Sequence, residues 1–207
     1  MLSPSAWWRS FECNPSPLPL PRPLAGAQAL LRLLAMAEAL SEMAPESLDA
    51  RRLLADSLRD LGFANQLCKE PEPALGLYRR SLAVFEDLLE RKPEDFLARR
   101  SYGNVLGNLA QIEQREGKLE PALKHWTKAL AIFDELLKGD PEDVVARQGR
   151  AVMLYGRARC LEVLGRRTEA LECYRGSLEV LAALPSSIRA GPDPRHSGRR
   201  VRPRAAR

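Results

Sequence analysis

Histidine and cysteine are scarce in this chain of 207 residues, which limits the metal chemistry that it can support. The two histidines, His125 and His196, are widely separated, and none of the four cysteines belongs to a Cys-x-x-Cys pair. A structural zinc site needs four such ligands at short and regular spacings. We therefore expect neither a metal ion nor a cofactor. Cys68, Cys160 and Cys173 lie in helical patterns, where we expect small, buried and reduced thiols.

Several other sequence features are absent. The chain has no apolar run of about 18 residues, the minimum for a membrane-spanning helix. It has no basic segment followed by an apolar core, as a secretory signal would require. It also lacks a glycine-rich phosphate loop and a nucleophile beside a candidate base. We expect a cytoplasmic protein that has no membrane span and is not an enzyme.

The two ends of the chain differ in composition from its middle. Residues 1–23 contain six prolines, which prevent a regular helix. Trp7, Trp8 and Phe11 belong either to a docking motif or to an unstructured leader, and we favour the leader. Residues 185–207 carry seven arginines and one aspartate, so the net charge of +5 comes from this tail. The tail is expected to be disordered, and without interleaved aromatic residues it predicts no specific nucleic-acid partner.

The middle of the chain repeats with a period of 48 residues. Ala122, Trp126, Ala129 and Leu130 form a pattern of a small residue, an aromatic residue, a small residue and leucine. The same kind of pattern begins 48 residues earlier and 48 residues later, at residues 74 and 170. A fixed period of this length indicates a solenoid, whose units bury their apolar faces by stacking on neighbours.

Apolar residues recur at helical spacing inside each unit. We therefore expect an all-α fold, an α-α superhelix (solenoid) of about seven helices in stacked antiparallel pairs. The expected repeat domain spans residues 24–184, with a half-repeat at 24–45 and units at 46–93, 94–141 and 142–184. The half-repeat is either a capping helix or the sign of a fragment of a longer protein. We expect weak self-association through this uncapped half-repeat.

Capping residues, glycines and prolines predict where the helices begin and end. Asp140 is expected to cap the helix that follows it, and Thr168 to cap the last helix. Gly117 suits the left-handed residue after a helix end, and Gly165 separates the last pair of helices. In the first unit, residues 69–73 are expected to form a turn before a helix that begins at Ala74.

The aligned positions resemble the tetratricopeptide repeat. The middle unit matches the spaced positions of that family at Leu106, Leu109, Ala110, Gly117, Ala122, Trp126, Ala129 and Leu130. The resemblance covers residues 24–184. The usual unit of the family has about 34 residues, so the period here is more like that of long-helix variants.

The resemblance implies a non-catalytic protein-protein interaction scaffold, which binds a peptide or a partner helix in a concave groove lined by the first helix of each pair. Amides there can hydrogen-bond a peptide backbone, and arginines can pair with carboxylates. The alternative functions are a regulatory or sensor segment of a larger multidomain signalling protein and, disfavoured, an enzyme. A solvated helix face is the simpler interpretation of any single groove residue. The residues expected to face the partner are Arg59, Asn104, Asn108, Gln111, Arg115, Tyr155 and Arg159.

Overall fold

The computed structural model describes residues 22–184, and all seven elements in this range are α-helices. The predicted tail and residues 1–21 of the predicted leader lie outside the described residues. Residues 22 and 23 of that leader belong to the first helix, α2. The expected all-α solenoid of stacked antiparallel helix pairs is confirmed for the described range. The helices are α2 (Arg22–Met43), α3 (Leu48–Leu67), α4 (Pro71–Arg91), α5 (Phe96–Arg115), α6 (Leu119–Gly139), α7 (Val144–Val163) and α8 (Arg167–Ala183).

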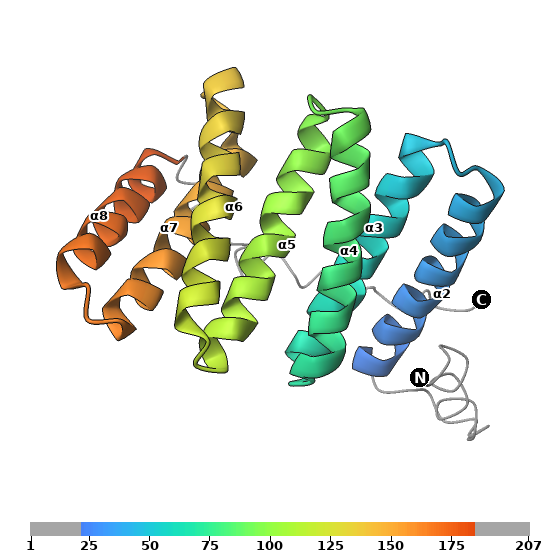
Figure 1. The fold of residues 1–207 in the computed structure, drawn as a ribbon, viewed down its shortest axis with the longest axis horizontal. Helices are drawn as coiled ribbons and strands as arrows, with labels where there is room; N and C mark the ends of the chain where they lie inside the picture. Colours follow the sequence, from blue (N-terminus) through green and yellow to red (C-terminus); the bar gives the residue numbers. More distant parts are fainter. Residues whose placement is uncertain (1–21, 185–207) are drawn as a thin grey trace, which may run out of the picture.

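The helices form a single row of antiparallel pairs, from α2 at one end to α8 at the other (Figure 1). The strongest packing joins the two helices of each unit, α3 with α4, α5 with α6 and α7 with α8. Each pair then packs on the next through α4 with α5 and α6 with α7, and α2 packs on α3. The turns inside the pairs all lie at one edge of the row, and the turns between units lie at the other (Figure 1).

The first helix of each unit begins with a side-chain cap. Ser47, Asp95 and Asp143 precede α3, α5 and α7, and each side chain accepts a hydrogen bond from a backbone N–H in the first turn. Such caps satisfy donors that have no partner inside the helix. The expectation for Asp140 was wrong, because this residue ends α6 and its carboxylate accepts from the N–H of Glu142 in the turn.

The second helices begin without a side-chain cap. Helix α4 starts at Pro71 rather than at Ala74, because the first turn of a helix needs no backbone donors and so accepts both Pro71 and Pro73. Helix α8 follows Arg166, so Thr168 lies inside the helix and is not its cap.

Each turn between the two helices of a unit contains one residue with a positive φ angle. In the second and third units this residue is glycine, with φ of 77° at Gly117 and 76° at Gly165. In the first unit Lys69 adopts the same left-handed conformation, with φ of 64°. A side chain makes this conformation unfavourable by about 1–2 kcal/mol, and glycine avoids that cost.

The junction between the second and third units is built from aromatic rings that rest on glycine. Trp126 of α6 is buried, and a Cβ atom added at Gly156 of α7 would lie 2.5 Å from its ring. A Cβ atom at Gly107 of α5 would lie 3.3 Å from the same ring. Phe133, two turns further along α6, occupies the space that a side chain at Gly149 would need. A side chain at Gly149 or Gly156 would clash with these rings.

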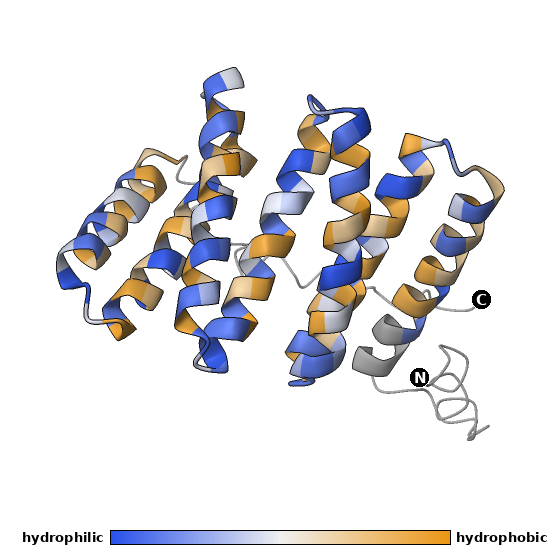
Figure 2. Cartoon of the chain, in the orientation of Figure 1, coloured by the Kyte–Doolittle hydropathy of each residue, from blue (hydrophilic) through white to orange (hydrophobic). Residues whose placement is uncertain are grey.

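Buried apolar side chains form a large cluster that extends from α3 to α8 and a smaller one between α2 and α3. Every helix also carries hydrophilic residues (Figure 2). Cys160 and Cys173 are buried as expected, but Cys68 is exposed because it ends α3 in the turn. None of the helices in residues 22–184 combines the length and the apolar character needed to cross a membrane.

Replacing Lys69 by glycine should make the protein more stable. The substitution relieves the left-handed conformation, so we expect the free energy of unfolding to rise by about 1 kcal/mol and the melting temperature by about 2–4 °C. Thermal unfolding followed by circular dichroism measures the change. Lys69→Ala is the control, since it removes the charge but keeps the strain, and it should not stabilise. A Lys69→Gly protein that melts at or below the native temperature would contradict the strain.

Replacing Trp126 by alanine should cost about 3–5 kcal/mol, the usual range for a buried aromatic residue. Its Nε1 atom has no hydrogen-bond partner in the described part of the chain, so the loss comes from packing alone. Tyr174 occupies the same place in the last unit but is only half-buried, so Tyr174→Ala should cost clearly less. Urea unfolding of both variants tests this order, and equal losses would be incompatible with the junction described above.

Candidate functional site

The first helices of the three units form one layer of the array. Helix α3 contacts α5 and α5 contacts α7, whereas no comparable contact joins α4 to α6 or α6 to α8. The first helices are therefore closer together than the second helices, and the row curves toward them. We call the exposed side of α3, α5 and α7 the inner face.

A hollow of about 450 Å³ lies on the inner face, near the N-terminal halves of these helices. Residues from all three units contribute to it, so no single pair of helices would form it. We call it the groove pocket, and it is lined by Arg52, Asp56, Arg59, Leu97, Arg100, Ser101, Asn104 and Val145.

Two arginines of the groove pocket are already paired with carboxylates of the protein. Arg59 binds Asp56 and Asp60, the second through Nε at 3.0 Å, and donates to the hydroxyl of Ser101 on α5 at 2.8 Å. Arg52 lies 2.6 Å from Asp49 and 3.4 Å from the buried Asp95. These contacts fix the arginines in place and join α3 to the next unit. Their charge is largely compensated before any partner arrives.

Helix α7 presents an apolar stripe to the inner face. Val145 lines the groove pocket, and Val152 follows it two turns later on the same side of the helix. Position 152 corresponds in the repeat to Asn104 and Asp56, which both line the groove pocket. Large apolar side chains this exposed suggest a contact surface when they are grouped. The α7 stripe consists of Val145 (50% exposed), Val152 (56%), Tyr155 (51%) and Val163 (64%).

Two of the amides predicted to face a partner take part in a network inside the protein. The Tyr78 hydroxyl donates to the Gln66 side chain at 2.8 Å, and the Gln66 amide donates to Gln111. Asn108 lies within hydrogen-bonding reach of the same hydroxyl. Its position corresponds to Gly156, which faces Trp126 in the next junction. Asn108 therefore points toward the preceding unit, and Gln111 keeps only part of its amide for a ligand.

The other predicted residues are spread along the inner face. Asn104 and Arg59 come together in the groove pocket. Arg115 is exposed at the far end of α5, where it lines a second hollow. Tyr155 packs edge-on against Tyr174 with ring centroids 5.8 Å apart, and Arg159 is exposed one turn further on. Of the seven residues, only Arg59 and Asn104 line the groove pocket, so the predicted residues do not form one compact site.

Sequence reasoning missed the apolar part of this surface. Val145 and Val152 were not expected there, although their spacing of seven residues places them on one side of α7 with Arg159. Two valines seven residues apart on an otherwise polar side of a helix could have indicated this apolar surface from the sequence. Arg100 was also missed. Its guanidinium lies 5.7 Å from the ring centre of Phe96, and it forms no ion pair with any described residue.

Metal ligands are not grouped within residues 22–184, where no three His, Cys, Asp or Glu side chains come close enough to hold an ion. His125 contacts the carboxylate of Glu113 through Nδ1 at 2.7 Å, on the second helix of its unit. The expected self-association through α2 stays a prediction. Its exposed residues include Met36 and Met43, which lie on the end of the row.

Comparison with known proteins finds likeness only among solved structures. No protein-family model matches the chain, and no curated protein matches it. The crystal structure of MamA aligns with 85% of this chain and 85% of its own, at 16% sequence identity and a TM-score of 0.42. BtubC (BKLC) from P. vanneervenii aligns over 86% of this chain and 96% of its own, at 14% identity and a TM-score of 0.22. A MamA RS-1 double mutant gives 19% identity and a TM-score of 0.20, over 74% of this chain and 97% of its own.

Because two tyrosines are buried, we expect the free energy of unfolding to fall in alkaline solution. Burial raises the pKa of Tyr78 well above 10, with a smaller opposing effect from Arg59, and burial also raises the pKa of Tyr102. An unfolded tyrosine ionises near pH 10, so above that pH the unfolded chain releases protons that the folded protein retains. The stabilising effect is therefore complete below pH 10 and is lost as the pH rises above it.

We expect the free energy of unfolding to decrease between pH 10 and 11, by up to about 1.4 kcal/mol per pH unit for each buried tyrosine. Urea unfolding at several pH values measures this slope. Tyr78→Phe should make this slope less steep by the contribution of one tyrosine. A slope that is identical in native protein and Tyr78→Phe would show that Tyr78 does not titrate in this range.

Proposed function

We propose that this protein is a non-catalytic scaffold of the long-helix tetratricopeptide type, which binds a protein segment along its inner face. The observation that carries the proposal is the α7 stripe, a row of exposed apolar side chains beside a polar pocket. Apolar anchors surrounded by fixed polar groups are the usual composition of a peptide-binding surface.

The arrangement favours a segment that is itself amphipathic. Apolar side chains of the partner would cover Val145 and Val152, which removes exposed surface from water and contributes about 25 cal/mol per Å². Polar groups of the partner would meet Asn104 and Arg100 in the groove pocket. The ion pairs of Arg59 and Arg52 hold that pocket rigid, so little side-chain freedom is lost on binding.

The ion pairs of Arg52 and Arg59 also argue against a partner that binds the groove pocket mainly through charge. Because Asp56, Asp60, Asp49 and Asp95 already surround two of the three arginines, the groove pocket offers limited attraction to an acidic chain. Shape and apolar contact are therefore expected to dominate the affinity, and its dependence on salt should be weak.

A charged residue in the α7 stripe should abolish most of the binding. Peptides selected from a displayed random library against the full chain provide the probes, and fluorescence anisotropy gives their dissociation constants. Val152→Asp should weaken them at least tenfold, which corresponds to about 1.4 kcal/mol. Val152 is exposed, so the fold should tolerate the change.

Ala131→Asp is the matched control, because Ala131 is exposed on the second helix α6 and receives the same new charge. It should leave the dissociation constant unchanged. Asn104→Ala should weaken binding by a smaller factor. If the selected peptides bind Val152→Asp as tightly as the native protein, the inner face is not the binding surface.

A further inference from the structure

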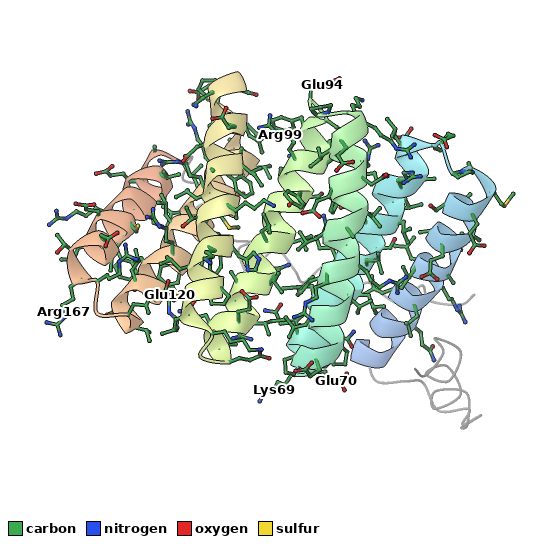
Figure 3. The ribbon with its side chains drawn as sticks, in the orientation of Figure 1. Lys69, Glu70, Glu94, Arg99, Glu120 and Arg167 are labelled. Atoms are coloured by element: carbon green, nitrogen blue, oxygen red, sulfur yellow. The ribbon has the colours of Figure 1, made fainter. Side chains whose placement is uncertain are left out.

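Helix α2 carries large apolar side chains on the side that faces away from the other helices. Its buried Leu34 packs with leucines of α3. Figure 3 shows α2 as the last helix at its end of the row, with side chains that point away from α3. The exposed apolar residues on this side are Leu33, Met36, Leu40 and Met43. We call these four residues the α2 stripe.

The α2 stripe has the spacing of a surface that pairs with another helix. Its members are three, four and three positions apart, and the exposed Ala29 extends the line by a further four positions. This alternation keeps apolar side chains on one line when two helices pack at a small angle. Ala35 and Ala39 beside the stripe are also exposed, and their small side chains let a second backbone approach closely.

The repeat shows what normally covers this side of a second helix. Leu40 is 44% exposed, whereas the equivalent Leu88 of α4 is fully buried. Leu33 corresponds to Ser81, whose buried hydroxyl donates to the carbonyl of Ala55 on α3 at 2.7 Å. In the first complete unit this side therefore packs on the first helix of the same unit. Within residues 22–184 no such helix pairs with α2.

Two opposite charges beside the stripe indicate which helix could take that place. Arg32 and Glu42 are exposed on the flank of the stripe that lies away from α3, and neither forms an ion pair with a described residue. The midpoint between them is residue 37, and the midpoint of the stripe is residue 38. A two-fold axis at this point would bring Arg32 of each copy near Glu42 of the other. A parallel pair would instead place like charges together, which opposes association.

We propose that the α2 stripe is a dimerisation surface, on which α2 of a second copy of this chain packs antiparallel about a two-fold axis near Ala37. Leu33 of each copy then lies near Met43 of the other, so the stripe covers itself. The inference does not depend on the proposed function, because neither the groove pocket nor the α7 stripe includes a residue of α2. The dimer would carry two inner faces, so a partner with two binding segments would gain avidity.

The opposite end of the row is less suited to such pairing. Helix α8 also exposes Leu171 and Leu178, but Arg175 lies on the same side of the helix between them. Burying that charge without a partner would oppose association. The α2 stripe contains no charged residue.

The size of the surface predicts a weak and reversible dimer. The 16 residues from Gln28 to Met43 form a strip about 24 Å long and about 12 Å wide, which is on the order of 300 Å² on each copy. A stable interface buries about 800 Å² on each partner. We therefore expect a dissociation constant on the order of 10–100 µM, in the weak class of interfaces.

Sedimentation equilibrium of the full chain, at concentrations from about 5 to about 500 µM, measures this constant. Met36→Glu should weaken the dimer at least tenfold, because two carboxylates then meet near the axis. Met36 is exposed, so the fold should tolerate the change, and thermal unfolding followed by circular dichroism checks this. Leu178→Glu is the matched control, since it places the same charge on an exposed apolar residue of α8. It should leave the dissociation constant unchanged.

A charge exchange tests the antiparallel arrangement. At low salt, Arg32→Glu and Glu42→Arg should each weaken the dimer at least threefold, because each single change sets like charges opposite one another twice. The double variant restores opposite charges across the axis, so its dissociation constant should return to within about twofold of the native value. Charges that act only on the folding of α2 would not give this recovery.

Three results would overturn the inference. The first is a monomer at every concentration, which would mean that no second copy covers the stripe. The second is a Leu178→Glu dimer as weak as that of Met36→Glu, and the third is a double charge variant as weak as the single variants. The proposed function is tested separately, because Val152→Asp should leave the dimer unchanged and Met36→Glu should leave the affinity for selected peptides unchanged.

Discussion

The array depends on one kind of contact, in which an aromatic ring of a second helix rests on a small residue of the first helices beside it. Trp126 lies between Gly107 and Gly156 in this way, and Tyr78 lies against Gly62. A glycine brings the helix backbone to the ring itself, so the two helices pack closely over their whole length. Each ring touches only its own unit and the next one. Stability is therefore assembled from local contacts between neighbours, as in other solenoids.

The two complete junctions use this contact differently, and the difference locates the candidate sites. Between α6 and α7 the partners of Trp126 and Phe133 are glycines, and the junction is tightly closed. Between α4 and α5 the equivalent positions hold Asn108 and Ser101, whose polar groups lie beside Tyr78 and Arg59. Residues of α3 and α5 contribute to both hollows, at the junction where these two positions are not glycine. The less compact junction leaves room for a ligand, and its hydrogen bonds keep the walls in place.

Much of the fold was predictable from the sequence because helical periodicity and turn chemistry act over a few residues. The helices, the left-handed Gly117 and the burial of Trp126 follow from such local signals. The starts of α7 after Asp143 and of α8 after Arg166 did not follow from such signals. Several polar residues near each turn compete for the position before the helix, and tertiary packing decides between them. The site was less predictable for the same reason. Periodicity places Asn108 on one side of α5, but its nearness to Tyr78 of the preceding unit depends on how neighbouring units pack.

The α7 stripe lies on the last described pair of helices, and this position affects the stability of that pair. On α8, Leu178 is 66% exposed, although the equivalent Leu130 on α6 is only 8% exposed beneath the following unit. Within the described residues, the pair α7 and α8 is therefore supported from one side only, and we expect its local free energy of opening to be the lowest among the complete pairs. A partner that covers the stripe binds the folded pair and not the opened one. Its binding free energy thus adds to the stability of this unit, so that occupancy of the inner face and order at this end of the array rise together.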